Sequence, residues 1–126
     1  MAESSKFVID ASFVLAFLLN DNSAVGNFFE KYKKGEISLY APYLLLFEVG
    51  NALRSSFLRK RITPSQASSL LKDFLSFEII FLAIDPIATL SFSMKQKVSF
   101  YDGSYAALSK KTRYPLLSLD KNLSSY

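Results

Sequence analysis

The sequence has 126 residues and a net charge of +4, and half of it is hydrophobic, with 12 Phe and 7 Tyr. This length is typical of one domain, predicted here over residues 1–126. The large side chains are sufficient to fill a core without disulfides or a structural metal. The absence of Cys and His excludes disulfides, thiolate zinc sites, Ser-His-Asp and Cys-His catalytic groups and an imidazole general base.

The first half of the chain alternates apolar strand patterns with helical periodicity. The predicted elements are a strand at 6–10, helices at 11–18 and from Asn22 or Ser23 to about 34, a strand at 37–40 and a helix at 42–58. Pro42 is expected at the first position of the long helix, and Gly35 suits the end of the helix before it. Residues 7–19 are apolar but too short to cross a bilayer, so we expect no membrane segment and a cytoplasmic protein.

The second half of the chain continues the alternation. Residues 63–66, Thr-Pro-Ser-Gln, form a capping box that predicts the start of a fourth helix. The further predicted elements are a strand at 78–84, a helix that Asp85 and Pro86 begin, a helix from Tyr101 or Asp102 to about 112, and a strand at 116–119. Strands separated by helices predict an α/β fold, a three-layer sandwich with a short, mainly parallel central sheet. Sites in such sheets form beyond the carboxyl ends of the strands.

Without His or Cys, chemistry has to come from carboxylates, Lys, Arg, Tyr, hydroxyls or a carboxylate-bound metal. Asp10 and Asp120 end predicted strands, and Asp102 opens a predicted helix. A functional carboxylate would explain these positions, and an ordinary helix cap or turn explains them equally well. Glu48 lies in an apolar stretch, either at the edge of a solvent-facing surface or aimed at a metal. Asp85 also follows an apolar strand, so position alone does not single out the functional acids.

Four short blocks add more specific information: Val8-Ile9-Asp10-Ala11-Ser12, Phe47-Glu48-Val49-Gly50-Asn51-Ala52-Leu53, Phe100-Tyr101-Asp102-Gly103-Ser104-Tyr105-Ala106-Ala107-Leu108 and Leu116-Leu117-Ser118-Leu119-Asp120-Lys121-Asn122-Leu123. Through these blocks, which span nearly the whole chain, the sequence resembles the PIN-domain ribonucleases, and among them the short VapC-type toxins of toxin–antitoxin pairs. Ser118 stands where the family usually has Thr, and Gly103 where Ala is common. The chain ends soon after Asp120, so the last edge of the sheet is expected to be absent or replaced by a partner.

The resemblance implies an endoribonuclease that uses Mg²⁺ or Mn²⁺ and leaves 5′-phosphate and 3′-hydroxyl ends. Asp10, Glu48 and Asp102 are expected to be the main metal ligands, and Asp120 a fourth ligand, directly or through water. Supporting hydrogen bonds are expected from Ser12, Asn51 and Ser118. A hard cation with oxygen ligands suits this chemistry, since it lowers the pKa of bound water and offsets developing charge.

The resemblance also implies an RNA substrate, a homodimer and a cognate antitoxin protein that blocks the site. Basic residues such as Arg54, Lys110 or Arg113 could hold the RNA backbone. One alternative is a catalytically inactive PIN-like module that binds RNA or a protein. A second is a receiver-like or phosphatase domain that is phosphorylated on Asp10, although Ser12 stands where that class has a second Asp.

Overall fold

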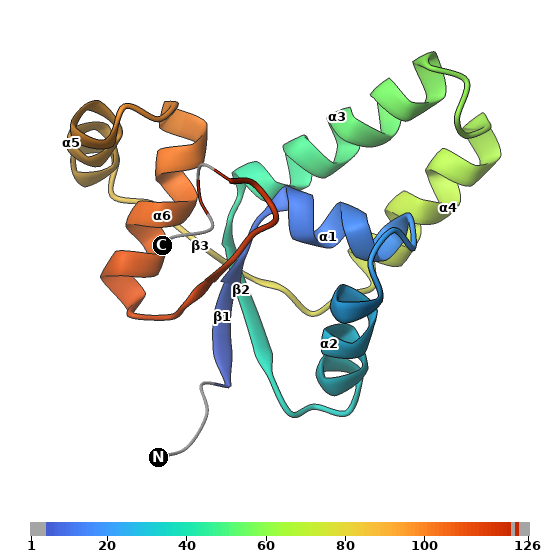
Figure 1. The fold of residues 1–126 in the computed structure, drawn as a ribbon, viewed down its shortest axis with the longest axis horizontal. Coiled ribbons are helices and arrows are strands. Elements are labelled where there is room, and N and C mark those ends of the chain that lie inside the picture. Colours follow the sequence, from blue (N-terminus) through green and yellow to red (C-terminus); the bar gives the residue numbers. More distant parts are fainter. Residues whose placement is uncertain (1–4, 122, 124–126) are drawn as a thin grey trace.

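The computed structural model describes residues 5–121 and 123, so residues 1–4, 122 and 124–126 of the predicted domain, including Asn122 of the last block, lie outside it. In chain order the elements are β1 (Lys6–Ile9), α1 (Ala11–Leu18), α2 (Ser23–Lys33), β2 (Ser38–Pro42), α3 (Leu44–Leu58), α4 (Pro64–Leu75), β3 (Ile80–Leu82), α5 (Pro86–Gln96), α6 (Phe100–Thr112) and β4 (Leu116–Leu117). Figure 1 shows α5 and α6 on one face of the sheet, and α1 to α4 on the other. The predicted three-layer α/β architecture is confirmed.

The central sheet has the strand order β3-β2-β1-β4, and its pairings are all parallel. In register, Val8 of β1 lies between Tyr40 of β2 and Leu116 of β4. The order reverses direction at β1, because β2 lies on one side of it and β4 on the other. Open parallel sheets bind ligands at such a switch point, beyond the carboxyl ends of the strands. The order also differs from that of flavodoxin-like receiver domains, in which β1 lies between β2 and β3.

Local capping explains where most helices begin. The side chains of Asn22, Thr63 and Asp85 each accept a hydrogen bond from a backbone N–H in the first turn of α2, α4 and α5. Gln66 completes the predicted capping box by accepting from the backbone N–H of Thr63. Gly35 has a positive φ of 74° just after α2, as its place at a helix end predicts.

Four predicted boundaries are wrong. Pro42 ends β2 opposite Leu82 instead of starting the long helix, since the last residue of a strand does not need the N–H that proline lacks. The strands expected at 78–84 and 116–119 shorten to Ile80–Leu82 and Leu116–Leu117, because both lie at the sheet's edges and pair along one side only. Helix α6 begins earlier than expected, because Ser99 caps it.

The core lies between the sheet and its two helical layers. Val8 and Ile9 of β1 are fully buried, as are Leu39 of β2 and Val49 of α3. On the side of α1 and α2, phenylalanine rings pack together, with Phe17 stacked on Phe29 at a centroid distance of 4.2 Å. This core positions β1 rigidly, and its carboxyl end with it. No helix within the described residues is long and apolar enough to cross a membrane.

On the opposite face, α5 packs very closely against α6 at Gly103. A Cβ atom at this position would lie 2.0 Å from the Oγ of Ser93, so only glycine allows the observed approach. The hydroxyl of Ser93 is held in place by donating to the carbonyl oxygen of Thr89 at 2.7 Å. Because Gly103 follows Asp102 directly, this contact places α5 beside the start of α6.

Candidate active site

Asp10 lies at the switch point, directly after β1, and its exposure is only 4%. Its Oδ1 accepts hydrogen bonds from the hydroxyl of Ser12 at 2.7 Å and from the backbone N–H of Phe13 at 3.1 Å. Its Oδ2 accepts one from the hydroxyl of Ser118. Asp10 is therefore the N-cap of α1, and its hydrogen bond with Ser118 also joins it to the segment after β4. The capping role that the sequence allowed for Asp10 is therefore compatible with a place among the side chains of a candidate site.

Ser12 and Ser118 link the carboxyl ends of β1 and β4. While Ser12 donates to Asp10, its oxygen accepts the backbone N–H of Leu119 at 2.9 Å. Ser118 likewise donates to Asp10 and accepts the backbone N–H of Asp120 at 2.9 Å. Each hydroxyl therefore orients the buried carboxylate and fixes the chain that carries Asp120. In Figure 1 this segment passes close to the start of α1.

Glu48 lies on α3, half-buried, and its Oε1 accepts a hydrogen bond from the phenolic hydroxyl of Tyr105 on α6 at 2.5 Å. The Tyr105 ring is only 1% exposed, so the surrounding core holds the hydroxyl in place. Burial, the hydrogen bond and the negative charge of Glu48 all raise the pKa of Tyr105, so the hydroxyl remains a donor. Glu48 thus faces the α6 layer, and not the solvent-facing edge of α3.

Asp102 lies in the first turn of α6, but it is not the cap of that helix. The cap is Ser99, whose hydroxyl accepts the backbone N–H of Asp102 at 3.0 Å. The Asp102 carboxylate is therefore not engaged as an N-cap, contrary to one of the two roles that the sequence allowed. Asp120 is half-buried in the segment after β4.

The four acids act on one another electrostatically. Burial raises the pKa of Asp10, and the charge of Asp120 raises it further, against the hydrogen bonds from Ser118, Ser12 and Phe13 that lower it. For Glu48, burial raises the pKa, the hydrogen bond from Tyr105 lowers it, and the charges of Asp102 and Asp10 raise it.

Asp102 follows the same pattern. Burial raises its pKa most, and the charges of Asp120 and Asp10 add to this, while the contact with Ser99 lowers it. The folded protein therefore brings these four acids into one electrostatic environment. A bound cation would relieve this repulsion.

The described carboxylates lie farther apart than the ligands of an assembled metal site. Within residues 5–121 and 123, no three acidic side chains approach closely enough to hold a metal ion together. The chemistry of the donors nevertheless fits a hard divalent cation, which prefers carboxylate oxygens and water. Asp10 and Glu48 are already oriented by hydroxyl donors, so the residues fit such an ion in type and in charge.

Other residues singled out in the sequence lie apart from this network. Asn51 is exposed on α3, and within the described chain its side chain makes no hydrogen bond to the site. Asp85 is exposed and caps α5 by accepting the N–H of Ala88, and its charge does not act on the other carboxyls named above. The Nζ of Lys110 lies over the Phe92 ring, 5.8 Å from its centroid, and not against a carboxylate.

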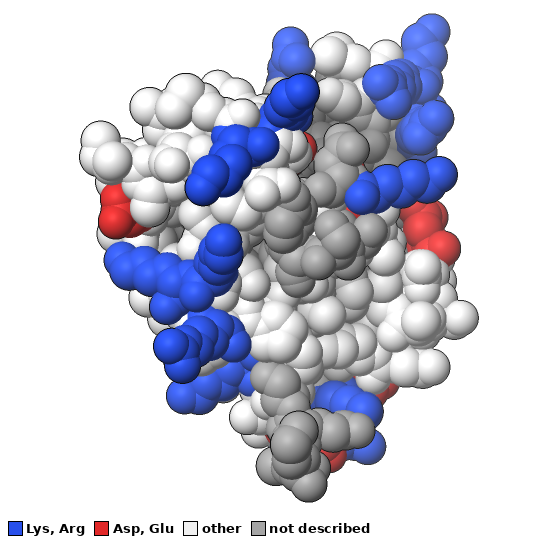
Figure 2. Space-filling view, turned by 60° about the vertical axis from the view of Figure 1, so that its left-hand side comes forward, with Lys and Arg blue, Asp and Glu red and all other residues white. Residues whose placement is uncertain are grey.

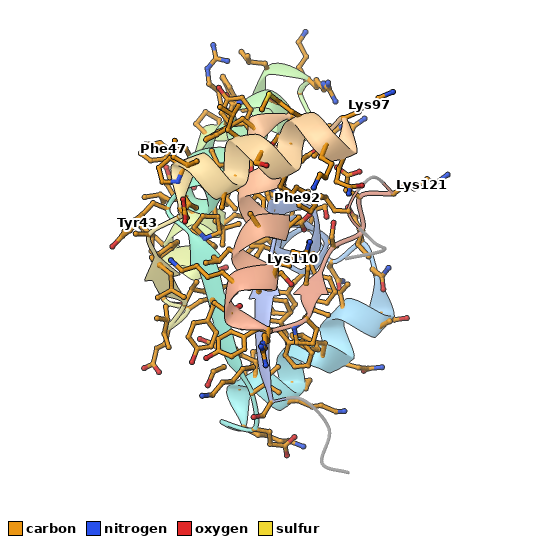
Figure 3. All side chains as sticks on the ribbon, turned by 90° about the vertical axis from the view of Figure 1, so that its left-hand side faces the viewer. Tyr43, Phe47, Phe92, Lys97, Lys110 and Lys121 are labelled. Carbon is orange, nitrogen blue, oxygen red and sulfur yellow. The ribbon has the colours of Figure 1, made fainter. Side chains whose placement is uncertain are left out.

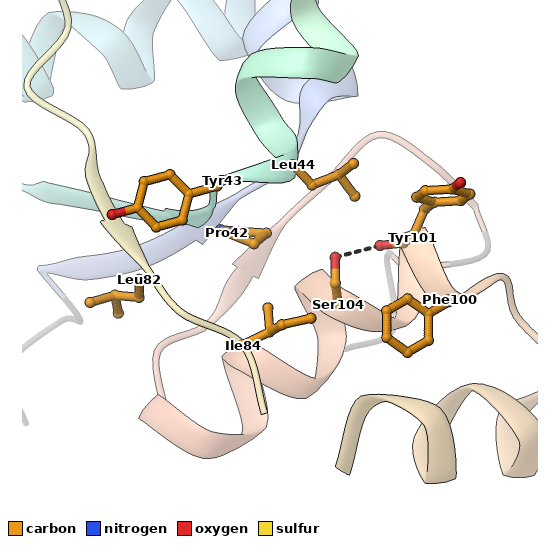
Figure 4. Close-up of a pocket in the computed structure, with 8 residues that line it drawn as sticks. All are labelled: Pro42, Tyr43, Leu44, Leu82, Ile84, Phe100, Tyr101 and Ser104. Atoms are coloured by element: carbon orange, nitrogen blue, oxygen red, sulfur yellow. Dashed lines mark hydrogen bonds between the residues drawn. The ribbon is translucent and has the colours of Figure 1, made fainter. Parts of the chain in front are cut away.

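An apolar hollow of about 250 Å³ lies beside the start of α6. Figure 4 shows its lining: Pro42, Tyr43, Leu44, Leu82, Ile84, Phe100, Tyr101 and Ser104. The hydroxyl of Ser104 donates to the carbonyl oxygen of Tyr101 at 2.6 Å, so it adds little polarity to the hollow. Tyr43 and Tyr101 are each 62% exposed. The hollow therefore presents an apolar surface next to the turn of α6 that carries Asp102.

Sequence reasoning did not select Tyr105, although it holds Glu48. A local signal was present, because Tyr105 lies three residues after Asp102 and so on the same side of α6. Its partner on α3 is 57 residues away in the chain, which no local pattern reveals.

Sequence comparison finds similarity to bacterial ribonucleases, although no family model matches the chain. The chain is 34% identical to ribonuclease VapC1 of Mycobacterium tuberculosis over 87 residues, which are 68% of the chain, and it spans 65% of the length of that relative. It is 26% identical to ribonuclease VapC9 of the same organism over 117 residues, covering 93% of the chain and 87% of the relative.

Two solved structures share the fold. The crystal structure of PAE2754 from Pyrobaculum aerophilum matches with a TM-score of 0.75 and 28% identity, covering 94% of this chain and 76% of that one. That of VapC20 from Mycobacterium tuberculosis, a Sarcin-Ricin loop cleaving toxin, matches with a TM-score of 0.65 and 15% identity, covering 94% and 93%. The likeness to VapC20 is one of fold alone. Together with the sequence relatives, these structures confirm the predicted resemblance.

Proposed function

Because the chain belongs to the VapC-type PIN-domain family, we propose that it is an endoribonuclease, the toxin of a toxin–antitoxin pair, which hydrolyses RNA with the help of Mg²⁺ or Mn²⁺. The observation that carries this proposal is the mutual electrostatic action of Asp10, Glu48, Asp102 and Asp120. Relatives across most of the chain's length are named ribonucleases, which supports the same activity.

In this proposal Asp10, Glu48 and Asp102 hold the divalent ion, with Asp120 as a further ligand, directly or through water. When bound, the ion would lower the pKa of a water and offset charge developing on the phosphate. The chain's own residues prepare the ligands. Ser12 and Ser118 orient Asp10, and Tyr105 orients Glu48. Such supporting contacts limit the reorganisation that ligand binding requires.

The decisive experiment measures RNA cleavage by the purified protein with Mg²⁺, with Mn²⁺ and with EDTA. We expect cleavage with either ion and none with EDTA. Asp10→Asn should abolish cleavage while the circular dichroism spectrum stays native. Asp85→Asn is the matched control, because it removes a carboxylate that caps a helix but does not act on the other acids. Cleavage that persists in EDTA and in Asp10→Asn would refute the proposal.

A second candidate function is a catalytically inactive module that binds RNA or protein. The observation that favours it is the spacing of the acids, because no three of those described lie close enough to hold an ion. Calorimetric titration with Mn²⁺ separates the two functions. The nuclease predicts stoichiometric binding that Asp10→Asn weakens, whereas the inactive module predicts no saturable binding at these acids.

We infer two protein partners, an antitoxin and a second copy of the chain. The antitoxin is supported by the apolar surface near the start of α6, where Tyr43 and Phe47 point outward with exposures of 62% and 69% (Figure 3).

The second copy of the chain is supported by α5, where Ile87 and Met94 are 77% and 67% exposed and lie seven residues apart, on one side of the helix. The pair of changes Ile87→Lys and Met94→Lys should halve the mass measured by light scattering, while Phe47→Lys should leave the mass unchanged.

A further inference from the structure

A groove between α5 and α6 is lined by basic side chains. Its lining residues are Ala88, Ser91, Phe92, Lys95, Gln96, Ala107, Lys110 and Lys111. The groove measures about 400 Å³ and shares no lining residue with the apolar hollow. Figure 2 brings this side of the molecule forward and shows Lys and Arg side chains spread across it, with few acidic side chains among them.

The three groove lysines have no acidic partner among the described residues. Lys33 forms an ion pair with Glu30 on α2, whereas Lys95, Lys110 and Lys111 pair with no carboxylate of the residues that the structure describes. All three are exposed. Three unneutralised ammonium groups along one groove repel each other, and an anionic ligand would relieve that repulsion.

The contacts between α5 and α6 relate the groove to the acids. Helix α5 crosses α6 at a steep angle (Figure 3), with Ser93 packed against Gly103 in the first turn of α6 and Phe92 against Lys110 further along it. Phe92, which lines the groove, is next to Ser93 in the chain, so the α5 side of the groove adjoins the first turn of α6, where Asp102 lies. With a helical rise of about 1.5 Å per residue, Lys110 lies about 12 Å along α6 from Asp102. This distance is on the scale of a few nucleotides.

We propose that the α5–α6 groove binds backbone phosphates of the RNA substrate through Lys95, Lys110 and Lys111, and so leads the strand to the carboxylate edge. The inference rests on the proposed ribonuclease function and adds a second contact region to it. Lysines bind phosphates as point charges, without reading bases, so this contact supplies affinity and register but no sequence selectivity.

A simpler explanation of these lysines is their place at helix ends. Lys95 lies in the last turn of α5, and Lys110 and Lys111 lie in the last turn of α6, where cations favour the helix dipole. Lysines also lie near the carboxyl ends of α2 and α4, where they too favour the helix dipole. Lys31 and Lys72 lie in the last turns of these helices, and Lys34 follows α2. They are exposed and line no groove with the others, so they separate the two explanations.

The test measures binding of a fluorescently labelled single-stranded RNA by anisotropy, in EDTA so that the RNA is not cut. We compare the wild type with two triple variants, Lys95→Gln/Lys110→Gln/Lys111→Gln and Lys31→Gln/Lys34→Gln/Lys72→Gln, which change the net charge equally. We expect the groove variant to bind roughly tenfold more weakly or worse, with a slope of log K against log salt reduced by about 2. The control variant should keep most of the affinity and nearly the wild-type slope.

Two results would overturn the groove proposal: equal losses in both variants, which would indicate net charge alone, or wild-type binding by the groove variant. The proposed function is judged separately, by cleavage with Mg²⁺. If the wild type cleaves RNA and the groove variant binds normally, only the groove is rejected. If the wild type binds RNA through these lysines but never cleaves it, the nuclease is rejected and the groove remains.

Discussion

The phenolic hydroxyl of Tyr105 on α6 donates a hydrogen bond to the carboxylate of Glu48 on α3, and this contact joins the helical layers on the two sides of the sheet. The Tyr105 ring is buried, so its position does not depend on Glu48. The fixed hydroxyl of Tyr105 therefore orients the half-buried carboxylate of Glu48, and not the reverse. It also lowers the pKa of Glu48 against the effects of burial and of its acidic neighbours.

We expect Tyr105→Phe to weaken Mn²⁺ binding by about tenfold or more, because removing a group that orients a ligand typically has this effect. The fold should persist, since the buried ring is retained. Calorimetric titration of the protein without RNA measures the affinity directly. Tyr40→Phe is the control, because its ring packs on Tyr114 and its hydroxyl is not bonded to a carboxylate in the described chain. Equal Mn²⁺ affinity in the two variants would show that Tyr105 only fills the core.

The metal-free protein should be more stable without the charge of Asp102. Asp10, Glu48 and Asp102 have folded-state pKa values raised above ordinary values of 3.8, 4.5 and 3.8, so the folded chain binds protons at higher pH than the unfolded chain. The stability that this contributes is present at low pH and is lost as pH rises through the folded pKa. In EDTA at pH 7, Asp102→Asn should therefore raise the free energy of unfolding by about 0.5–1 kcal/mol.

The gain from Asp102→Asn should shrink as the pH falls toward 4, because protonation increasingly removes the charge whose repulsion destabilises the folded state. Urea unfolding in EDTA between pH 4 and pH 8 measures it. Asp73→Asn, an exposed position on α4, controls for the loss of one negative charge. Addition of Mg²⁺ should stabilise the wild type at pH 7 and less at pH 5, where protons compete for the same oxygens. A pH-independent difference between wild type and Asp102→Asn would contradict the coupling of the acids.

Ser118→Ala should destabilise the protein by about 1–3 kcal/mol, because the hydroxyl donates to buried Asp10 and accepts the N–H of Asp120. It should also weaken Mn²⁺ binding, since Asp10 and Asp120 lose a common contact. Ser118→Thr keeps the hydroxyl and should restore both properties. Thermal unfolding and Mn²⁺ titration of the two variants test this. If Ser118→Thr behaves like Ser118→Ala, the hydroxyl is not the group that matters.

Gly103→Ala should destabilise the fold although it adds a better helix former. A Cβ at this position would lie 2.0 Å from the Ser93 Oγ, and the overpacking cost of about 1–3 kcal/mol exceeds a propensity gain of about 1 kcal/mol. Gly26→Ala in α2 is the matched control, because no atom lies within 4 Å of the added Cβ, and it should stabilise the protein. Adding Ser93→Ala to Gly103→Ala should recover part of the loss. Urea unfolding of these variants measures each effect.

The sequence alone was sufficient for features that depend on neighbouring residues. The α/β class, the parallel sheet, the helix starts at Thr63 and Asp85, and the start at Asn22, one of the two positions predicted, follow from periodicity and from hydrogen bonds that span two or three residues. Boundaries that depend on pairing were predicted less well. Pro42 is compatible with a helix start and with a strand end, and the partner strand β3 decided between them.

The composition of the candidate site depended on the tertiary structure. Local sequence patterns do not distinguish Asp10 from Asp85, because each residue follows a strand and caps a helix. What distinguishes Asp10 is Ser118, which lies 108 residues away and reaches it only because β4 pairs with β1. Glu48 meets Tyr105 across 57 residues for a similar reason, through packing of α6 near β1 and β2. Capping energies are local, whereas burial and mutual charge repulsion arise only when distant segments fold together.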